Sequence, residues 1–205
     1  MNRLTSNQRE VLEKILELDI FHEFYLAGGT SLLLKYNHRL SLNFDFFLLP
    51  NKKFKLELYE KNLLTSFQNL EIVYRDTQTL IFSLKGVKVS LFEYPYPLIK
   101  EIEKIKNVSV ASDEDIACMK VDAISKRGLK KDFFDLWTLI KIHKWSINDL
   151  FDMIQKKYAG YNLALFLKSL TYFDDTEKNK DFQEVENSWG IIKDFFRNYV
   201  KMYEF

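Results

Sequence analysis

Cysteine is nearly absent from this chain of 205 residues, and proline and glycine are scarce. The single cysteine, Cys118, excludes an intrachain disulfide, and the chain shows no cysteine and histidine spacing of the zinc-binding kind. Cys118 lies in an apolar helical pattern without a histidine or cysteine neighbour, which favours a core position over a nucleophile. No internal repeat and no low-complexity segment is present.

An excess of charge of either sign is lacking too, because 30 lysines and arginines face 29 aspartates and glutamates. Contact with nucleic acid would then need a local patch, which argues against a protein that coats nucleic acid. The sequence also lacks an N-terminal signal peptide and any apolar run long enough to cross a bilayer. Together with the single cysteine, these absences predict a soluble, cytoplasmic protein with no membrane partner.

Hydrophobic residues make up 47% of the chain and include 18 phenylalanines, so a sizeable core can form. Residues 6–19, 30–36 and about 52–64 have helical patterns, and the runs 70–75, 79–84 and 87–92 are typical of strands. A helix is expected to start at Ser112 and another after Gly128, and beyond Leu136 the pattern is almost wholly helical. We therefore expect an α/β (α+β) fold, with a mixed sheet and flanking helices in residues 1–106 and a helical region in residues 107–205.

The stretch from Phe24 to Phe47 predicts a short strand, a turn with two glycines, a short helix and a second strand. Gly28 and Gly29 stand at the sharp turn and allow the backbone N–H groups of the helix start to approach an anion of phosphate size. Asp45 lies inside the second apolar strand, where an unpaired buried carboxylate would be costly. The spacing brings Asp45 back to the turn, where a carboxylate can hold a divalent cation against the same phosphates.

Two blocks of residues carry a resemblance to a known family. The first is Gly28-Gly29-Thr30-Ser31 followed by His38-Arg39-x-Ser41-x-Asn43-x-Asp45-Phe46-Phe47. The second is Ser112-x-Glu-Asp-Ile-Ala-x-Met-Lys120-x-Asp-Ala-Ile-x-x-Arg127, followed by Lys131-Asp132-Phe-x-Asp135-Leu136. In this order the two blocks resemble motifs of the AbiEii-like toxins, which are nucleotidyltransferases of the polymerase-β-type superfamily. The matching blocks cover most of residues 20–142.

The resemblance implies an activity, its cofactor and its partners. The fold would be nucleotidyltransferase-like, with the helical region completing the cleft. The enzyme would use Mg²⁺ to transfer a nucleoside monophosphate from an NTP to a hydroxyl of RNA, such as tRNA, or of a protein. The toxin would have a cognate antitoxin as its partner. Asp45 and Asn43 would bind the metal, and the catalytic residues would be Asp45, Lys120, Asp132 and Asp135. The nucleotide would bind to Gly28, Gly29, Thr30, Ser31, Arg39 and Arg127.

Asn43 departs from the family pattern, which has an aspartate at this position. An asparagine keeps a carbonyl oxygen that can bind a hard cation, but it removes one negative charge. Metal affinity should therefore be lower, and activity reduced or lost. The alternative function is a nucleotide-binding or interaction module that keeps the fold without turnover.

Several assignments stay open at this level. The hydroxyls of Thr30 and Ser31 suit either a helix cap or a phosphate. Asp132 and Asp135 are either acids at a helix start that face solvent, with Asp135 paired to Arg127, or groups that point into the cleft. A third metal-binding carboxylate has no clear counterpart, because the corresponding strand offers only Ser90 or the displaced Glu93.

Overall fold

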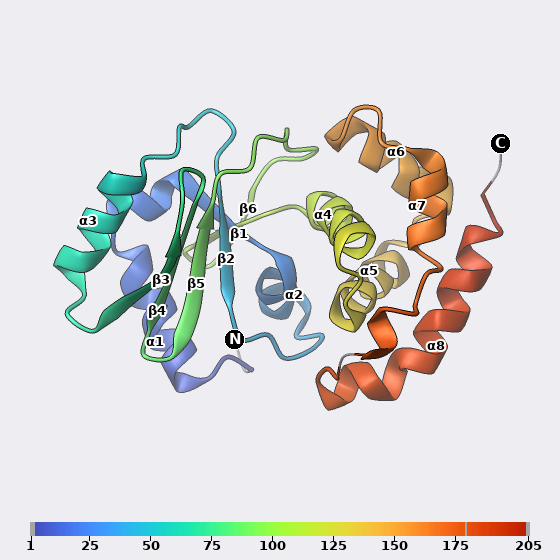
Figure 1. The fold of residues 1–205 in the computed structure, drawn as a ribbon, viewed down its shortest axis with the longest axis horizontal. Helices are drawn as coiled ribbons and strands as arrows, with labels where there is room; N and C mark the ends of the chain where they lie inside the picture. Colours follow the sequence, from blue (N-terminus) through green and yellow to red (C-terminus); the bar gives the residue numbers. More distant parts are fainter. Residues whose placement is uncertain (1–2, 179, 204–205) are drawn as a thin grey trace. The chain divides into compact units, whose positions relative to one another are not determined.

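The computed structural model describes residues 3–178 and 180–203, and the chain divides into two compact units (Figure 1). The first unit contains the chain up to Pro97 together with Glu101–Ala111, and the second contains Leu98–Lys100 and the chain from Ser112 onward. Within the described residues the first unit holds a seven-stranded sheet with flanking helices and the second is helical. The expected α/β class is therefore confirmed.

In the first unit the sheet has the strand order β3-β4-β5-β2-β1-β7-β6. Its central strands β1 and β2 are antiparallel, whereas β2 runs parallel to β5 and β1 runs parallel to β7. The elements are α1 (Ser6–Leu16), η1 (Asp19–Glu23), β1 (Phe24–Ala27), α2 (Gly28–Tyr36), β2 (Phe44–Leu48), α3 (Leu56–Ser66), β3 (Leu70–Arg75), β4 (Thr79–Leu84), β5 (Val87–Phe92), β6 (Glu103–Ile105) and β7 (Val108–Val110).

Local signals account for most of these boundaries. The three strand-like runs coincide with β3, β4 and β5, and the hairpin between the last two turns at Lys85 and Gly86, which both have positive φ. Helix α1 is capped by Thr5 and not by Ser6, because the Thr5 hydroxyl accepts from Gln8 N while the Gln8 side chain accepts from Thr5 N.

One face of this sheet forms the core of the first unit. Phe44, Phe46 and Leu48 alternate along β2 with less buried residues, and each is at most 2% exposed. They belong to one cluster with apolar residues of α1 and α3, the helices on this side of the sheet in Figure 1. Asp45 and Phe47 are directed to the opposite face by the same alternation.

The second unit consists of α4 (Asp113–Lys126), α5 (Lys130–His143), α6 (Ile147–Lys157), α7 (Leu163–Ser169), η2 (Thr176–Lys178) and α8 (Gln183–Val200). Its linking segment Leu98–Lys100 is held by Asp115, which accepts from the N–H groups of Ile99 and Lys100. Asp115 also pairs with Lys157 at 2.6 Å, and both side chains are fully buried. In the described part of the chain no helix combines the length and the apolar character needed to span a membrane.

Candidate active site

The start of α2 forms a tight turn that only glycine fits. Gly28 has a φ of +73°, and a Cβ there would lie 3.7 Å from Asp45 Oδ2. A Cβ on Gly29 would collide with the guanidinium of Arg39. Among the described residues no side chain caps α2, since its N-cap is Ala27. The first N–H groups of the helix therefore lack the side-chain acceptor that a cap would provide, as an anion-binding helix start requires.

The hydroxyls beside this turn bond to the protein itself. Thr30 is 1% exposed, and its hydroxyl donates to the main-chain carbonyl of Asn43 and bonds to the Ser41 hydroxyl at 2.8 Å. The Ser31 hydroxyl donates to Gly28 O at 2.7 Å and is fully buried. Neither hydroxyl is seen to cap the helix by accepting from a backbone N–H. These bonds fix the helix start against the segment that leads into β2, whereas phosphate contacts of Thr30 and Ser31 stay a prediction.

Arg39 lies over the turn and is only 2% exposed. Its Nη1 donates to Leu40 O at 2.7 Å, and its guanidinium occupies the space that a side chain on Gly29 would need. This burial excludes a solvent-exposed position for Arg39, whereas nucleotide binding by Arg39 stays a prediction.

Asp45 is the partly exposed carboxylate at this turn. Its backbone pairs with Ala27 on β1 and with Ser90 on β5, so the three side chains form one row across the sheet. Among the described residues the Asp45 carboxylate has no hydrogen bond and no ion pair. A carboxylate that is partly buried and has no partner among these residues is suited to bind a cation or a substrate hydroxyl.

The two residues paired with Asp45 in its row, Ala27 and Ser90, are uncharged. Ser90 is 1% exposed and occupies the position directly opposite Asp45 on β5. Glu93 lies beyond the end of that strand, where its carboxylate accepts from Gln78 Nε2 at 2.9 Å. Asn43 is exposed just before β2, and its side chain carries no charge. In the described residues no group of three or more histidine, cysteine, aspartate or glutamate side chains is arranged to hold a metal.

This donor set fits one Mg²⁺ ion that is shared with a substrate. Mg²⁺ keeps several waters and is often bound by one or two carboxylates together with substrate phosphates. Asp45 would provide one carboxylate to such an ion, and the contribution of the Asn43 amide stays a prediction. A second ion would need further carboxylates, which neither Ser90 nor Glu93 supplies at this row.

The second unit gathers four of the other predicted site residues into a buried ionic cluster. Lys120 Nζ lies 2.9 Å from Asp132 Oδ1 and 2.7 Å from Asp135 Oδ2, and both carboxylates are fully buried. Arg127 Nε is 3.0 Å from Asp132 Oδ2. The alternative of two acids facing solvent is therefore wrong, and Arg127 is seen to pair with Asp132.

The charge state of Asp132 follows from these contacts. Burial alone would raise the pKa of its carboxyl, but the neighbouring Lys120 and Arg127 outweigh burial and hold that pKa below its usual range. Asp132 therefore stays ionised and paired with Lys120 and Arg127, and a carboxylate held in this way is a poor general base. By contrast, burial raises the pKa of the Cys118 thiol, in keeping with a core cysteine.

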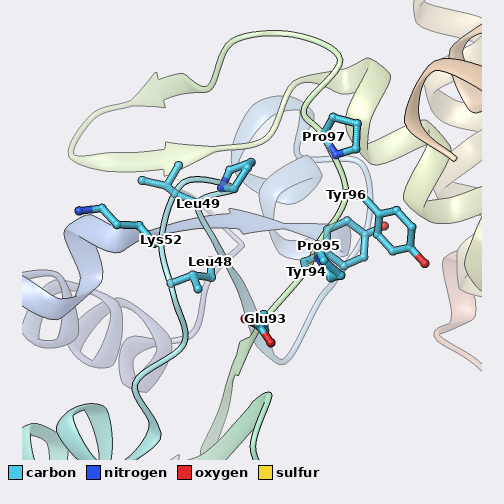
Figure 2. Close-up of a pocket in the computed structure, with 9 residues that line it drawn as sticks. Leu48, Leu49, Lys52, Glu93, Tyr94, Pro95, Tyr96 and Pro97 are labelled. Atoms are coloured by element: carbon cyan, nitrogen blue, oxygen red, sulfur yellow. The ribbon is translucent and has the colours of Figure 1, made fainter. Parts of the chain in front are cut away.

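A pocket of about 240 Å³ lies at the ends of β2 and β5 (Figure 2). Residues 48–50 and Lys52 form one wall, and residues 93–97 form the other, with the Tyr94 and Tyr96 rings next to each other. Sequence patterns alone did not reveal this pocket, whose lining includes Pro95 and Pro97. The alternating tyrosines and prolines of residues 94–97 were the sequence signal that could have indicated it.

Comparisons with known proteins agree with this architecture. The family described as "Nucleotidyl transferase AbiEii toxin, Type IV TA system" matches residues 10–198. An uncharacterized protein of Aquifex aeolicus (strain VF5) is 42% identical over 205 residues, which cover 99% of this chain and 98% of the relative.

Two solved structures from Helicobacter pylori share the fold. A candidate nucleotidyltransferase superposes with a TM-score of 0.53 at 18% identity, covering 98% of this chain and 100% of that one. The protein JHP933 superposes with a TM-score of 0.50 at 17% identity, covering 94% and 90%. At such identities the likeness concerns the fold alone.

Proposed function

We infer that this chain, which belongs to the AbiEii family of nucleotidyl transferase toxins, transfers a nucleoside monophosphate from an NTP to an acceptor hydroxyl. One observation carries this proposal beyond family membership. Among the described residues, the Asp45 carboxylate has no hydrogen-bond or ion-pair partner, and it lies beside a glycine turn whose helix start has no side-chain cap. Such a pair of features suits a triphosphate and its counter-ion.

In the reaction the acceptor oxygen forms a bond to the α-phosphorus, while the bond from that phosphorus to the pyrophosphate oxygen breaks. The acceptor hydroxyl gives its proton to solvent water, and pyrophosphate leaves. Gly28 and Gly29 let the N–H groups of α2 approach the phosphates, and Asp45 would hold the Mg²⁺ ion that these phosphates share. Bound Mg²⁺ would supply charge neutralisation for the leaving pyrophosphate.

The acceptor and the partners remain part of the proposal. An RNA hydroxyl, such as that of tRNA, or a protein hydroxyl would receive the nucleotide, and a cognate antitoxin would restrain the toxin. The contributions of Lys120, Arg127, Asp132 and Asp135 stay predictions, and the lowered pKa of Asp132 favours a positioning role over proton transfer for that residue.

A second function is favoured by the neutral residues around Asp45. With asparagine at position 43 and serine at position 90, the site has one carboxylate where two-metal chemistry needs more. The chain would then bind nucleotides without transferring them.

Label transfer tests both functions. The protein is incubated with Mg²⁺, each α-labelled NTP in turn, and total RNA or total protein, and the labelled macromolecule is identified. We expect transfer that Asp45→Asn abolishes, whereas the control Glu71→Gln, a neutralised exposed carboxylate on β3 of the same sheet, keeps it. Transfer that survives in Asp45→Asn would refute the site. Nucleotide binding without transfer in the wild type would favour the second function.

A further inference from the structure

Aromatic side chains continue the face of the sheet that carries Asp45. Phe47 lies opposite Phe92 in the register of β2 and β5, with the ring centroids 5.3 Å apart. Tyr94 follows the end of β5, and its ring centroid is 5.2 Å from that of Phe47. We call Phe47, Phe92 and Tyr94 the aromatic row.

The register places Asp45 between the glycine turn and the aromatic row. Ala27 pairs with Asp45, so Gly28 follows on one side of Asp45 along the sheet. Phe47 lies two residues away on the other side, at roughly 7 Å along the strand and on the same face. A nucleotide has its phosphates and its base at opposite ends, and this face offers a matching polar end and aromatic end.

Burial distinguishes this row from the aromatic residues of the core. Phe44 and Phe46, on the opposite face of β2, are at most 1% exposed beneath the helices of the first unit. Phe47, Phe92 and Tyr94 are all partly exposed. Partly exposed aromatic rings beside a polar site favour a flat ligand that can stack on them.

We propose that the aromatic row stacks against the base of the bound NTP; this assignment rests on the proposed function. The row reads the π-face of the base and not its hydrogen-bonding edge. Glu93 alternates away from the row and is bonded to Gln78, so its carboxylate does not select a base edge. Because every base has a π-face, the four NTPs should bind within about tenfold of one another.

The test compares ligands with and without a base. Calorimetric titration in Mg²⁺ measures the affinity of ATP, CTP, GTP and UTP, and separately that of inorganic tripolyphosphate. The variants Tyr94→Leu and Phe92→Leu keep an apolar side chain and remove the ring, while Tyr94→Phe keeps the ring. Tyr74→Leu is the control, since Tyr74 is 51% exposed on β3 at the edge of the same sheet.

We expect Tyr94→Leu and Phe92→Leu to lose about fivefold or more in affinity for all four NTPs, with tripolyphosphate binding unchanged. Tyr94→Phe and Tyr74→Leu should bind like the wild type. Unchanged NTP affinity in both leucine variants would overturn the proposal. An equal loss for NTP and tripolyphosphate would overturn it too, because the rings would then only support the phosphate site.

Failure of the proposed function gives a different result. If Asp45→Asn leaves Mg²⁺-dependent binding of tripolyphosphate unchanged, the phosphate and metal assignment fails, whatever the leucine variants show. Both assignments are supported if Tyr94→Leu loses affinity for the NTPs but not for tripolyphosphate, and Asp45→Asn loses Mg²⁺-dependent binding of tripolyphosphate.

Discussion

Replacing Lys120 by methionine tests whether the buried ionic cluster of the second unit holds this unit together. The Lys120 side chain is 7% exposed and lies within 2.9 Å of two fully buried carboxylates. In Lys120→Met the unbranched side chain fills much of the same space, but both carboxylates lose this cation. Asp132 keeps Arg127, whose side chain is 56% exposed, while Asp135 loses its close ammonium partner.

The magnitude follows from the cost of breaking a buried ion pair, about 3–5 kcal/mol when one partner is removed. With a urea slope of about 2 kcal/mol per molar, the midpoint should fall by roughly 1.5–2.5 M. All three tryptophans, Trp137, Trp145 and Trp189, belong to the second unit, so tryptophan fluorescence reports its unfolding.

Lys126→Met is the matched control on the same helix. Lys126 pairs with Asp122 at 2.8 Å, but its side chain is 66% exposed. The expected loss is within about 1 kcal/mol. Equal midpoints for Lys120→Met and Lys126→Met would refute the argument. If the argument holds, adding Asp135→Asn to Lys120→Met should recover part of the loss, because a neutral amide no longer needs a cation.

Two further predictions concern changes of charge at Asp132 and at Asn43. The pKa of Asp132 is lowered in the folded state, so its contribution to stability is present above the unfolded pKa of about 3.9 and is lost as the pH falls through the lower folded value. Urea titrations from pH 6 downward should therefore show a shallower acid-induced loss below about pH 4 in Asp132→Asn than in the wild type, and identical pH profiles would contradict the pairing. Asn43→Asp should tighten Mg²⁺ binding in a titration and raise transfer if metal occupancy limits it. Unchanged Mg²⁺ affinity with a normal melting curve would remove Asn43 from the site.

The sequence alone determined the local elements of this protein. The runs 70–75, 79–84 and 87–92 become β3, β4 and β5, and the alternation is clearest in β4, where Leu80, Phe82 and Leu84 are buried and the residues between them are partly exposed. Gly28 and Gly29 mark the turn, because the positive φ of Gly28 strains any other residue and a Cβ on Gly29 would collide with the guanidinium of Arg39. Ser112 marks the start of α4 by its bond to Asp115 N.

The tertiary structure decided what depends on residues far apart in the chain. Pairing of β7 with β1 through Leu26 and Val110 places Val108–Val110 in the sheet and residues 107–111 in the first unit, although this short run carries little pattern of its own. The register that sets Ser90 opposite Asp45 shows a single carboxylate in that row. Lys120, Asp132 and Asp135 satisfy one another in the interior because a buried charge needs a partner, and periodicity along one helix cannot show which charge on the next helix will provide it.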